Sequence, residues 1–266
     1  FRNFLFVELN KLDVLGRIYV ASEGINAQLS LPSKNIDKLK DLIDDITFLN
    51  KVRLNIAIEH DDESFLKLKI KIREKIVADG LKEHEYDLDK NGEHVNAERF
   101  NSLLEDKNTI TVDMRNHYES EIGHFKGAEL PDVDTFRDSL PIINDKYKNQ
   151  KTKKNILMYC TGGIRCEKAS AYLIKNGYKN VYQLEGGIIE YARQIKKYDI
   201  ENKFIGKNFV FDNRLSESIS KQIISFCHQC DEKCDNHVNC NNEACHLLFL
   251  QCEKCYEKYS GCCCSE

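Results

Sequence analysis

The sequence predicts an α/β protein whose central part is a doubly wound parallel sheet, preceded by a smaller α+β unit and followed by a cysteine-rich tail. Apolar runs typical of buried strands alternate with helical patterns over residues 90–198, which is the arrangement of β–α–β units in a parallel sheet. Residues 1–82 combine several short apolar runs with one helical pattern. Ten of the twelve cysteines fall between Cys227 and Cys264, so residues 205–266 form a third region of different composition.

Length and composition narrow the class of protein. A chain of 266 residues suits two or three domains, and its net charge of −4 does not indicate a nucleic-acid partner, so RNA binding requires a local basic patch. No apolar run approaches the roughly 20 residues of a membrane span. The long segment without cysteine before Cys160 argues against a disulfide-stapled secreted protein and indicates a cytoplasmic one with reduced thiols.

The first unit is expected to be a ferredoxin-like or acylphosphatase-like α+β domain with helices on one face of its sheet. The chain begins at Phe1 rather than at methionine, within an expected strand, so we expect this domain to be incomplete, with its first helix partly missing. Ser33 is a candidate N-cap for a helix with Ile36, Leu39, Leu42, Ile43 and Ile46 on one face. Strands are expected at Phe4–Val7, Gly16–Ala21, Ala27–Leu31 and Val52–Ile58, and within Phe65–Val77.

The last of these segments carries a basic residue at every second position. Side chains alternate across a strand, so five cations share one face: Lys67, Lys69, Lys71, Arg73 and Lys75. Such a basic stripe can follow an RNA phosphate backbone, but lysines also protect exposed sheet edges or simply face solvent. The five residues are therefore candidates for RNA binding, with a solvated or guarded strand as the alternative.

The clearest functional motif begins where an apolar strand pattern ends on Cys160. A loop of Thr161, Gly162, Gly163 and Ile164 follows, and Arg165 and Cys166 open a helical pattern. In this geometry loop N–H groups and the helix N-terminus converge on the sulfur and stabilise a thiolate, or an anionic group attached to it. Cys160 and Arg165 are therefore the candidate catalytic residues, and an inert glycine-rich turn is the alternative.

The length of the loop favours sulfur chemistry over phosphate chemistry. Four residues separate Cys160 from Arg165, one fewer than in cysteine phosphatases, so the loop suits a smaller guest such as the terminal sulfur of a persulfide. Cys166 either resolves such a persulfide or packs as a small apolar residue, and we favour packing.

A second motif follows a helix expected over Asn96–Leu104 and a strand expected over Thr109–Val112. Asp113 and Arg115 follow this strand directly. We expect them to form an internal ion pair that supports the loop after the strand, rather than to take part in chemistry. His124 is likewise expected to be a structural turn residue.

The tail has the spacing of thiolate metal sites. Two Cys-x-x-Cys pairs present two sulfurs each, with further cysteines and histidines between them. The candidate zinc ligands are Cys227, Cys230, Cys234, Cys240, Cys245, Cys252, Cys255 and His246, enough for two tetrahedral sites. The terminal run Cys262–Cys264 looks too crowded for ligation. Disulfides or a solvent-facing store of thiols are the alternatives.

Three motifs in this order resemble the rhodanese domain. They are Asp113-Met114-Arg115, the Gly123–Ala128 segment and the Cys160 loop. The whole chain further resembles the bacterial tRNA uridine hydroxylase family, through the segments Ala21–Asn26, Met158–Ser170 and Cys245–Phe249.

The resemblance implies a tRNA-modifying oxidoreductase that hydroxylates wobble uridine at C5 to 5-hydroxyuridine. Molecular oxygen would be the co-substrate and the tRNA anticodon region the partner, with Cys160 as the active residue and persulfide carrier. No flavin, haem or iron ligand set is evident in the sequence. Two alternatives stay open: a rhodanese-type sulfurtransferase with a sulfur donor or acceptor protein, and a zinc-containing RNA-binding module without catalysis.

Overall fold

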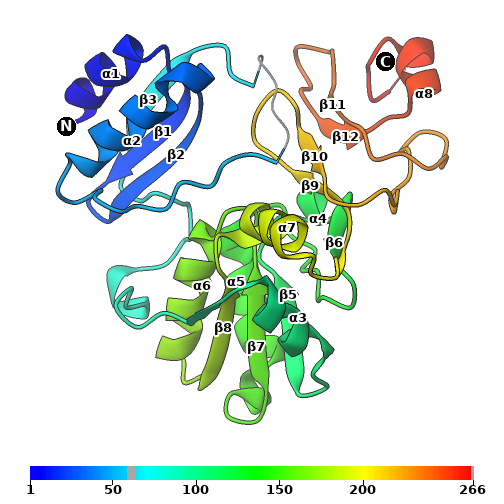
Figure 1. The fold of residues 1–266 in the computed structure, drawn as a ribbon. Helices are drawn as coiled ribbons and strands as arrows, with labels where there is room; N and C mark the ends of the chain where they lie inside the picture. Colours follow the sequence, from blue (N-terminus) through cyan, green and yellow to red (C-terminus); the bar gives the residue numbers. More distant parts are fainter. Residues whose placement is uncertain (59–63, 265–266) are drawn as a thin grey trace. The chain divides into compact units, whose positions relative to one another are not determined.

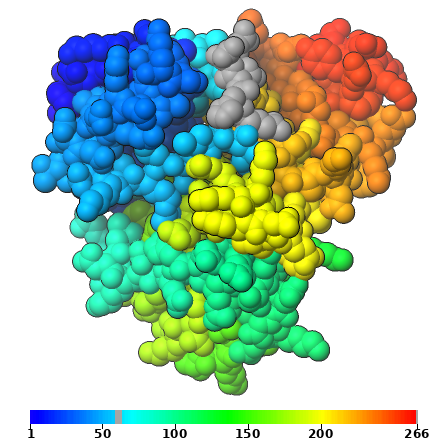
Figure 2. All heavy atoms as spheres, viewed as in Figure 1, coloured from blue at the N-terminus to red at the C-terminus, as the bar shows by residue number. Residues whose placement is uncertain are grey.

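The computed structural model describes residues 1–58 and 64–264 (Figures 1 and 2). The chain forms two compact units, one of residues 1–78 with 211–214 and one of residues 79–210 with 215–266. Among the described residues, no helix is long and apolar enough to cross a membrane.

The first unit is a small sheet with both helices on one face. Its elements are α1 (Arg2–Lys11), β1 (Leu15–Ala21), β2 (Gly24–Ser30), the 3-10 turn η1 (Ser33–Asn35), α2 (Ile36–Asp44) and β3 (Leu68–Ile72). Strand β1 lies between β2, to which it is antiparallel, and β3, to which it is parallel. Leu5 of α1 and Leu39 of α2 pack in the same buried cluster as Ile18 and Ile70, so the expected one-sided α+β layering is confirmed.

Three predictions for this unit are wrong in detail. The expected strand Phe4–Val7 lies inside α1, because Leu5 and Leu9, one helical turn apart, are the buried residues while Phe4, Phe6 and Val7 stay exposed. Residues 52–58 form no strand, and the segment from Phe65 to Val77 contributes only β3.

The second unit contains the predicted doubly wound parallel sheet (Figure 1). Its strands are β4 (Glu93–Val95), β5 (Thr109–Asp113), β7 (Asn155–Tyr159) and β8 (Asn180–Leu184), in the order β4-β8-β7-β5. The helices are α3 (Ala97–Glu105), α4 (His117–Ser120), α5 (Phe136–Lys146), α6 (Ile164–Lys175) and α7 (Gly187–Tyr198), with 3-10 turns η2 (Glu83–Glu85) and η3 (Lys148–Gln150).

Both faces of the central strand β7 are buried. Leu157 and Tyr159 join a core with Phe100 of α3 and Tyr191 of α7. The alternate residues of β7 are fully buried as well, and α6 packs on β7 and β8. Buried parallel strands of this kind place their carboxyl ends, and the loops that follow them, along one edge of the sheet.

The tail is built onto the second unit. Strand β9 (Phe204–Phe209) pairs with β6 (Gly123–Phe125) and with β10 (Ser216–Ser218), and β11 (His237–Asn239) pairs with β12 (Leu248–Leu250) before α8 (Glu253–Tyr259). His228 Nε2 lies 2.6 Å from Glu121 Oε1, immediately after α4. Lys207 Nζ of β9 lies 2.9 Å from Asp235 Oδ1. The first contact attaches the cysteine-rich segment to the end of α4, and the second holds it on β9.

Helix α7 begins directly against the loop that contains Cys160. The amides of Ile188 and Ile189 donate to the carbonyl oxygens of Cys160 and Thr161, at 3.0 and 3.2 Å. Gly187 has φ +65°, and a Cβ atom there would lie 2.5 Å from both of these oxygens. Only glycine therefore lets the start of the helix approach the loop closely enough to donate these hydrogen bonds.

This close approach predicts a large cost for Gly187→Ala. The substitution forces the loop away from α7, and we expect a loss of at least about 3 kcal/mol in the free energy of unfolding, measured by urea denaturation. Gly177→Ala is the matched control, because Gly177 also has positive φ (+92°) but nothing within 4 Å of a Cβ. For Gly177→Ala we expect a loss of only about 1–2 kcal/mol in the free energy of unfolding. Equal losses in the two variants would contradict the proposed crowding.

Candidate active site and metal-binding cysteines

The Cys160 sulfur sits in the loop between β7 and α6, as the motif predicts. The Cys160 side chain is 2% exposed. The Gly163 amide donates to Sγ at 3.1 Å, and Gly163 itself has φ +102°, the left-handed conformation that directs its N–H into the loop. The sulfur is thus held by the backbone of its own loop, while α7 holds the carbonyl oxygens on the other side.

The two loop thiols have opposite pKa shifts. A hydrogen bond from Cys166 is the main cause that lowers the pKa of Cys160 to about 6; burial opposes it, and the Arg165 charge and the amides of Cys166 and Gly163 add to it. Burial, followed by the interaction with Cys160, raises the pKa of Cys166 well above its usual value. At neutral pH the loop therefore contains one thiolate, on Cys160, and one thiol that donates to it.

Arg165 is fixed by Glu119, a residue that the sequence patterns did not single out. Its guanidinium contacts both carboxylate oxygens, at 2.5 and 2.7 Å, and Glu119 is fully buried. Burial alone would raise the pKa of Glu119, but the charge and hydrogen bonds of Arg165 lower it. Thr161 joins the pair through its hydroxyl, 3.3 Å from Glu119 Oε1. The arginine is an oriented part of the loop framework.

One signal in the sequence could have identified Glu119. Asn116 and Glu119 have the spacing of a capping box, and in the structure the Asn116 amide donates to Glu119 Oε2 at 3.0 Å. This cap begins α4 and turns the carboxylate inward toward Arg165.

Asp113 and Arg115 form a buried ion pair at the end of β5. Arg115 Nη2 lies 2.7 Å from Asp113 Oδ2, and both side chains are fully buried. Arg115 also donates to the carbonyl oxygens of Glu119, at 3.3 Å, and Gly123, at 2.5 Å. His124 Nδ1 lies 2.9 Å from the Ser120 carbonyl. These contacts are structural, and they hold the segment that carries Glu119.

The basic stripe belongs to the first unit. Lys69 and Lys71 lie on β3, which pairs only with β1 among the described strands and is therefore an edge. Ile70, on the opposite face, is buried. Lys67 and Arg73 extend the exposed side beyond the strand, and Lys75 is partly buried. Only Lys69 and Ile70 show the expected contrast of exposed and buried faces, because Lys71 is partly buried and Ile72 is 73% exposed.

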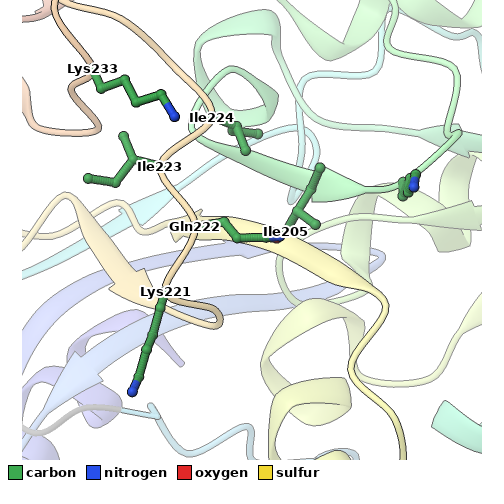
Figure 3. Close-up of a pocket in the computed structure, with 7 residues that line it drawn as sticks. Ile205, Lys221, Gln222, Ile223, Ile224 and Lys233 are labelled. Carbon is green, nitrogen blue, oxygen red and sulfur yellow. The ribbon is translucent and has the colours of Figure 1, made fainter.

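A shallow basic cavity lies in the second unit, which also contains Cys160 (Figure 3). Its volume is about 610 Å³, and no described acidic residue lines it. The walls come from Lys126, Ile205, Lys221, Gln222, Ile223, Ile224 and Lys233. The sequence patterns did not identify this surface, because its three lysines are far apart along the chain.

The tail cysteines gather in two groups. The sulfurs of Cys227, Cys230, Cys252 and Cys255 lie within 4.8 Å of one another, and so do those of Cys240, Cys245 and Cys263. Two of the predicted ligands, Cys234 and His246, belong to neither group. Cys234 Sγ instead accepts a hydrogen bond from the Asn236 amide at 3.4 Å, and His246 is exposed at a left-handed turn.

The spacing in the first group fits thiolate ligation. Cys230 Sγ and Cys252 Sγ are 3.6 Å apart. Two thiolates on one tetrahedral zinc ion, each at about 2.3 Å, lie about 3.8 Å from each other, whereas disulfide sulfurs are about 2.05 Å apart. The four sulfurs are therefore suited to hold one zinc ion.

The low pKa of Cys160 predicts its alkylation profile. The rate of iodoacetamide modification should rise with pH through about 6 and level off above it, because the thiolate is the reactive form. Trypsin separates Cys160, in peptide Asn155–Arg165, from Cys166, in Cys166–Lys168, so mass spectrometry can follow each thiol. Cys166→Ala removes the donor to Cys160 and should move the midpoint upward. A midpoint above pH 8 in the unsubstituted protein would contradict the thiolate assignment.

Comparison with known proteins matches all three regions. Residues 1–76 match the UPF0176 acylphosphatase-like domain, residues 96–194 the rhodanese-like domain and residues 205–266 the rhodanase C-terminal family. A protein of Leptospira interrogans named tRNA uridine(34) hydroxylase is 56% identical over 262 residues, which cover 98% of this chain and 71% of that protein. A protein of the same name from Photorhabdus laumondii is 52% identical over 264 residues, 99% of this chain and 75% of that protein. At this identity and coverage, the chain belongs to the tRNA uridine(34) hydroxylase family.

Proposed function

We propose that this protein is an enzyme that hydroxylates uridine 34, the wobble uridine of tRNA, at C5 and that Cys160 is its nucleophile. The observation that carries the proposal is the buried Cys160 sulfur, in a loop held by its own amide and by α7, in a chain 52–56% identical to relatives named for this reaction. The Arg165 charge helps to stabilise the thiolate, and Glu119 positions Arg165.

The chemistry requires a nucleophile because C5 of uracil does not react readily with oxygen. In this proposal the Cys160 thiolate adds to C6, and the electron pair moves to C5 and O4. The activated C5 bonds to one atom of molecular oxygen. The second oxygen atom leaves as water, with two electrons and two protons from a thiol reductant that is oxidised to a disulfide. Loss of the C5 proton then expels the Cys160 thiolate and restores the ring.

The burial of Cys160 requires the base to leave its stack. A side chain that is 2% exposed meets a nucleobase only when the nucleotide turns out of the RNA and enters the loop. Wobble nucleotides lie in an unpaired anticodon loop, where this movement costs least. The substrate is therefore tRNA in the cytoplasm, with the anticodon region as the part bound.

Two basic surfaces support an RNA partner. The β3 stripe presents Lys67, Lys69, Lys71 and Arg73, and the cavity of the second unit adds three further lysines. We assign the β3 stripe to phosphate contacts, which supply affinity without sequence specificity.

We further propose that the cysteine-rich tail binds zinc. Cys227, Cys230, Cys252 and Cys255 supply the four sulfurs of a structural site, and ligation would stabilise the fold of the tail.

A second candidate function is sulfur transfer through a Cys160 persulfide. The Gly163 amide, 3.1 Å from Sγ, and the short loop are suited to an anionic terminal sulfur supplied by a donor protein. Thiocyanate formation from thiosulfate and cyanide tests it, and an absence of Cys160-dependent product would remove it.

Hydroxylation by Cys160 is tested on tRNA nucleosides. Expression of the chain in a bacterial strain that lacks 5-hydroxyuridine at position 34 should restore this nucleoside. Cys160→Ser should reduce the amount of 5-hydroxyuridine formed by at least about 100-fold. Cys264→Ser, an exposed cysteine of the tail, is the matched control and should retain activity. Growth under ¹⁸O₂ should place one heavy oxygen in the nucleoside, and label arriving from water instead would contradict the proposal.

Charge reversal on β3 tests the RNA surface. Lys69→Glu with Lys71→Glu should weaken tRNA binding and reduce the slope of log affinity against log salt by about 2, one for each phosphate that the variant no longer neutralises. Lys34→Glu with Lys38→Glu changes the charge equally at two exposed positions of the same unit and should leave the slope unchanged. Equal effects of the two pairs would indicate only a general effect of charge.

A further inference from the structure

The second cysteine group repeats the arrangement of the first. Cys245 Sγ and Cys263 Sγ are 3.7 Å apart, close to the 3.6 Å between Cys230 and Cys252 in the first group. Both separations are those of thiolates on a shared tetrahedral ion, about 3.8 Å. The two groups therefore offer sulfur at the same spacing.

The hydrogen bonds to sulfur repeat as well. In the first group Cys227 Sγ accepts a hydrogen bond from the Cys252 backbone amide at 3.3 Å. In the second group Cys240 Sγ accepts one from the Cys263 backbone amide at 3.5 Å. Amide donors directed at sulfur in this way stabilise a metal-bound thiolate.

The backbone holds the two halves of the second group together. The Asn241 side chain donates to the Ser260 carbonyl oxygen at 2.8 Å, and the Asn241 backbone N–H donates to the Gly261 carbonyl oxygen at 3.1 Å. Gly261 has φ +72°, and a Cβ there would lie 2.4 Å from Asn241 Nδ2. The approach of the 240–245 loop to the terminal cysteines is therefore built into the fold.

Cys262 is the candidate for a fourth donor, because it directly precedes Cys263 in the chain. Three sulfurs leave one position of a tetrahedral site open. The Cys262 thiol lies outside the group of three, 3.9 Å from the Ser260 carbonyl oxygen, and it interacts electrostatically with Cys240. Cys264 is exposed, and its sulfur lies 4.0 Å from that of Cys263.

We propose that the tail binds a second zinc ion, beyond the site described above, through Cys240, Cys245, Cys262 and Cys263. The ligand pairs then alternate along the chain. The pairs Cys227/Cys230 and Cys252/Cys255 bind one ion, and the pairs Cys240/Cys245 and Cys262/Cys263 bind the other. Each ion closes a loop that contains half of the other site, so the two metals stabilise one interleaved module rather than two separate fingers.

Metal counting on the whole chain tests this arrangement. Protein purified under reducing conditions should contain two zinc ions per chain, and X-ray absorption should show an average of four sulfurs at about 2.3 Å around each. Cys263→Ser should reduce the count to one, and Cys255→Ser, in the first group, should do the same. A count of one in both the unsubstituted protein and Cys263→Ser would overturn the second site, while leaving the first site and hydroxylation untouched.

Cobalt substitution identifies the fourth ligand even if a variant folds poorly with zinc. The visible spectrum of the two-cobalt protein should show two tetrathiolate ions, and Cys262→Ser should convert one of them to a trithiolate site. Cys264→Ser and Cys234→Ser are the matched controls and should leave the spectrum unchanged. A spectrum that changes with Cys264→Ser but not with Cys262→Ser would overturn the assignment of Cys262.

Discussion

The active loop depends on one buried negative charge, the carboxylate of Glu119. An uncompensated charge at full burial is costly, so the fold must bring a cation to it, and Arg165 is that cation. The ion pair orients the arginine and, through the Thr161 hydroxyl, fixes the loop on one side. Helix α7 fixes the loop carbonyls on the other side. The amides of Gly163 and Cys166, the Cys166 thiol and the Arg165 charge act on the sulfur.

A second ion pair supports the first. Arg115 is neutralised by Asp113 at the end of β5, and its remaining donors hold the backbone of Glu119 and Gly123. The carboxyl ends of β5 and β7 are adjacent strand ends of the same sheet, so one row of charges runs from Asp113 to Arg165. The site is therefore ordered before any substrate arrives, which lowers the reorganisation that binding requires.

Local sequence predicted those parts of the fold whose determinants are close together in the chain. The Cys160 loop and the flanking β7 and α6 follow from patterns of a few residues. The strand expected at Phe4–Val7 is a helix because burial selects Leu5 and Leu9, a choice made by packing against Ile70 and not by β propensity.

The remaining parts of the site come from tertiary structure. Glu119 meets Arg165 across 46 residues, and its position could have been found only through the capping box with Asn116. Cys263 looked unsuited to ligation by spacing, and only the fold of the 240–245 loop onto Ser260 and Gly261 brings it to Cys240. Cys234 fits the spacing of a ligand, but the chain turns its sulfur toward the Asn236 amide.

The hydrogen bond between His228 and Glu121 connects these two sets of residues. His228 lies between Cys227 and Cys230 of the first group, and Glu121 follows the short helix that carries Glu119. If the tail binds zinc as proposed, this contact gives the metal site a direct path to α4 and so to the active loop. Linkage is reciprocal, so whatever factor zinc contributes to the affinity of the loop for its ligand, that ligand contributes to the affinity of the tail for zinc. If that factor favours binding, the tail would have a higher affinity for zinc when the active site is occupied than when it is empty.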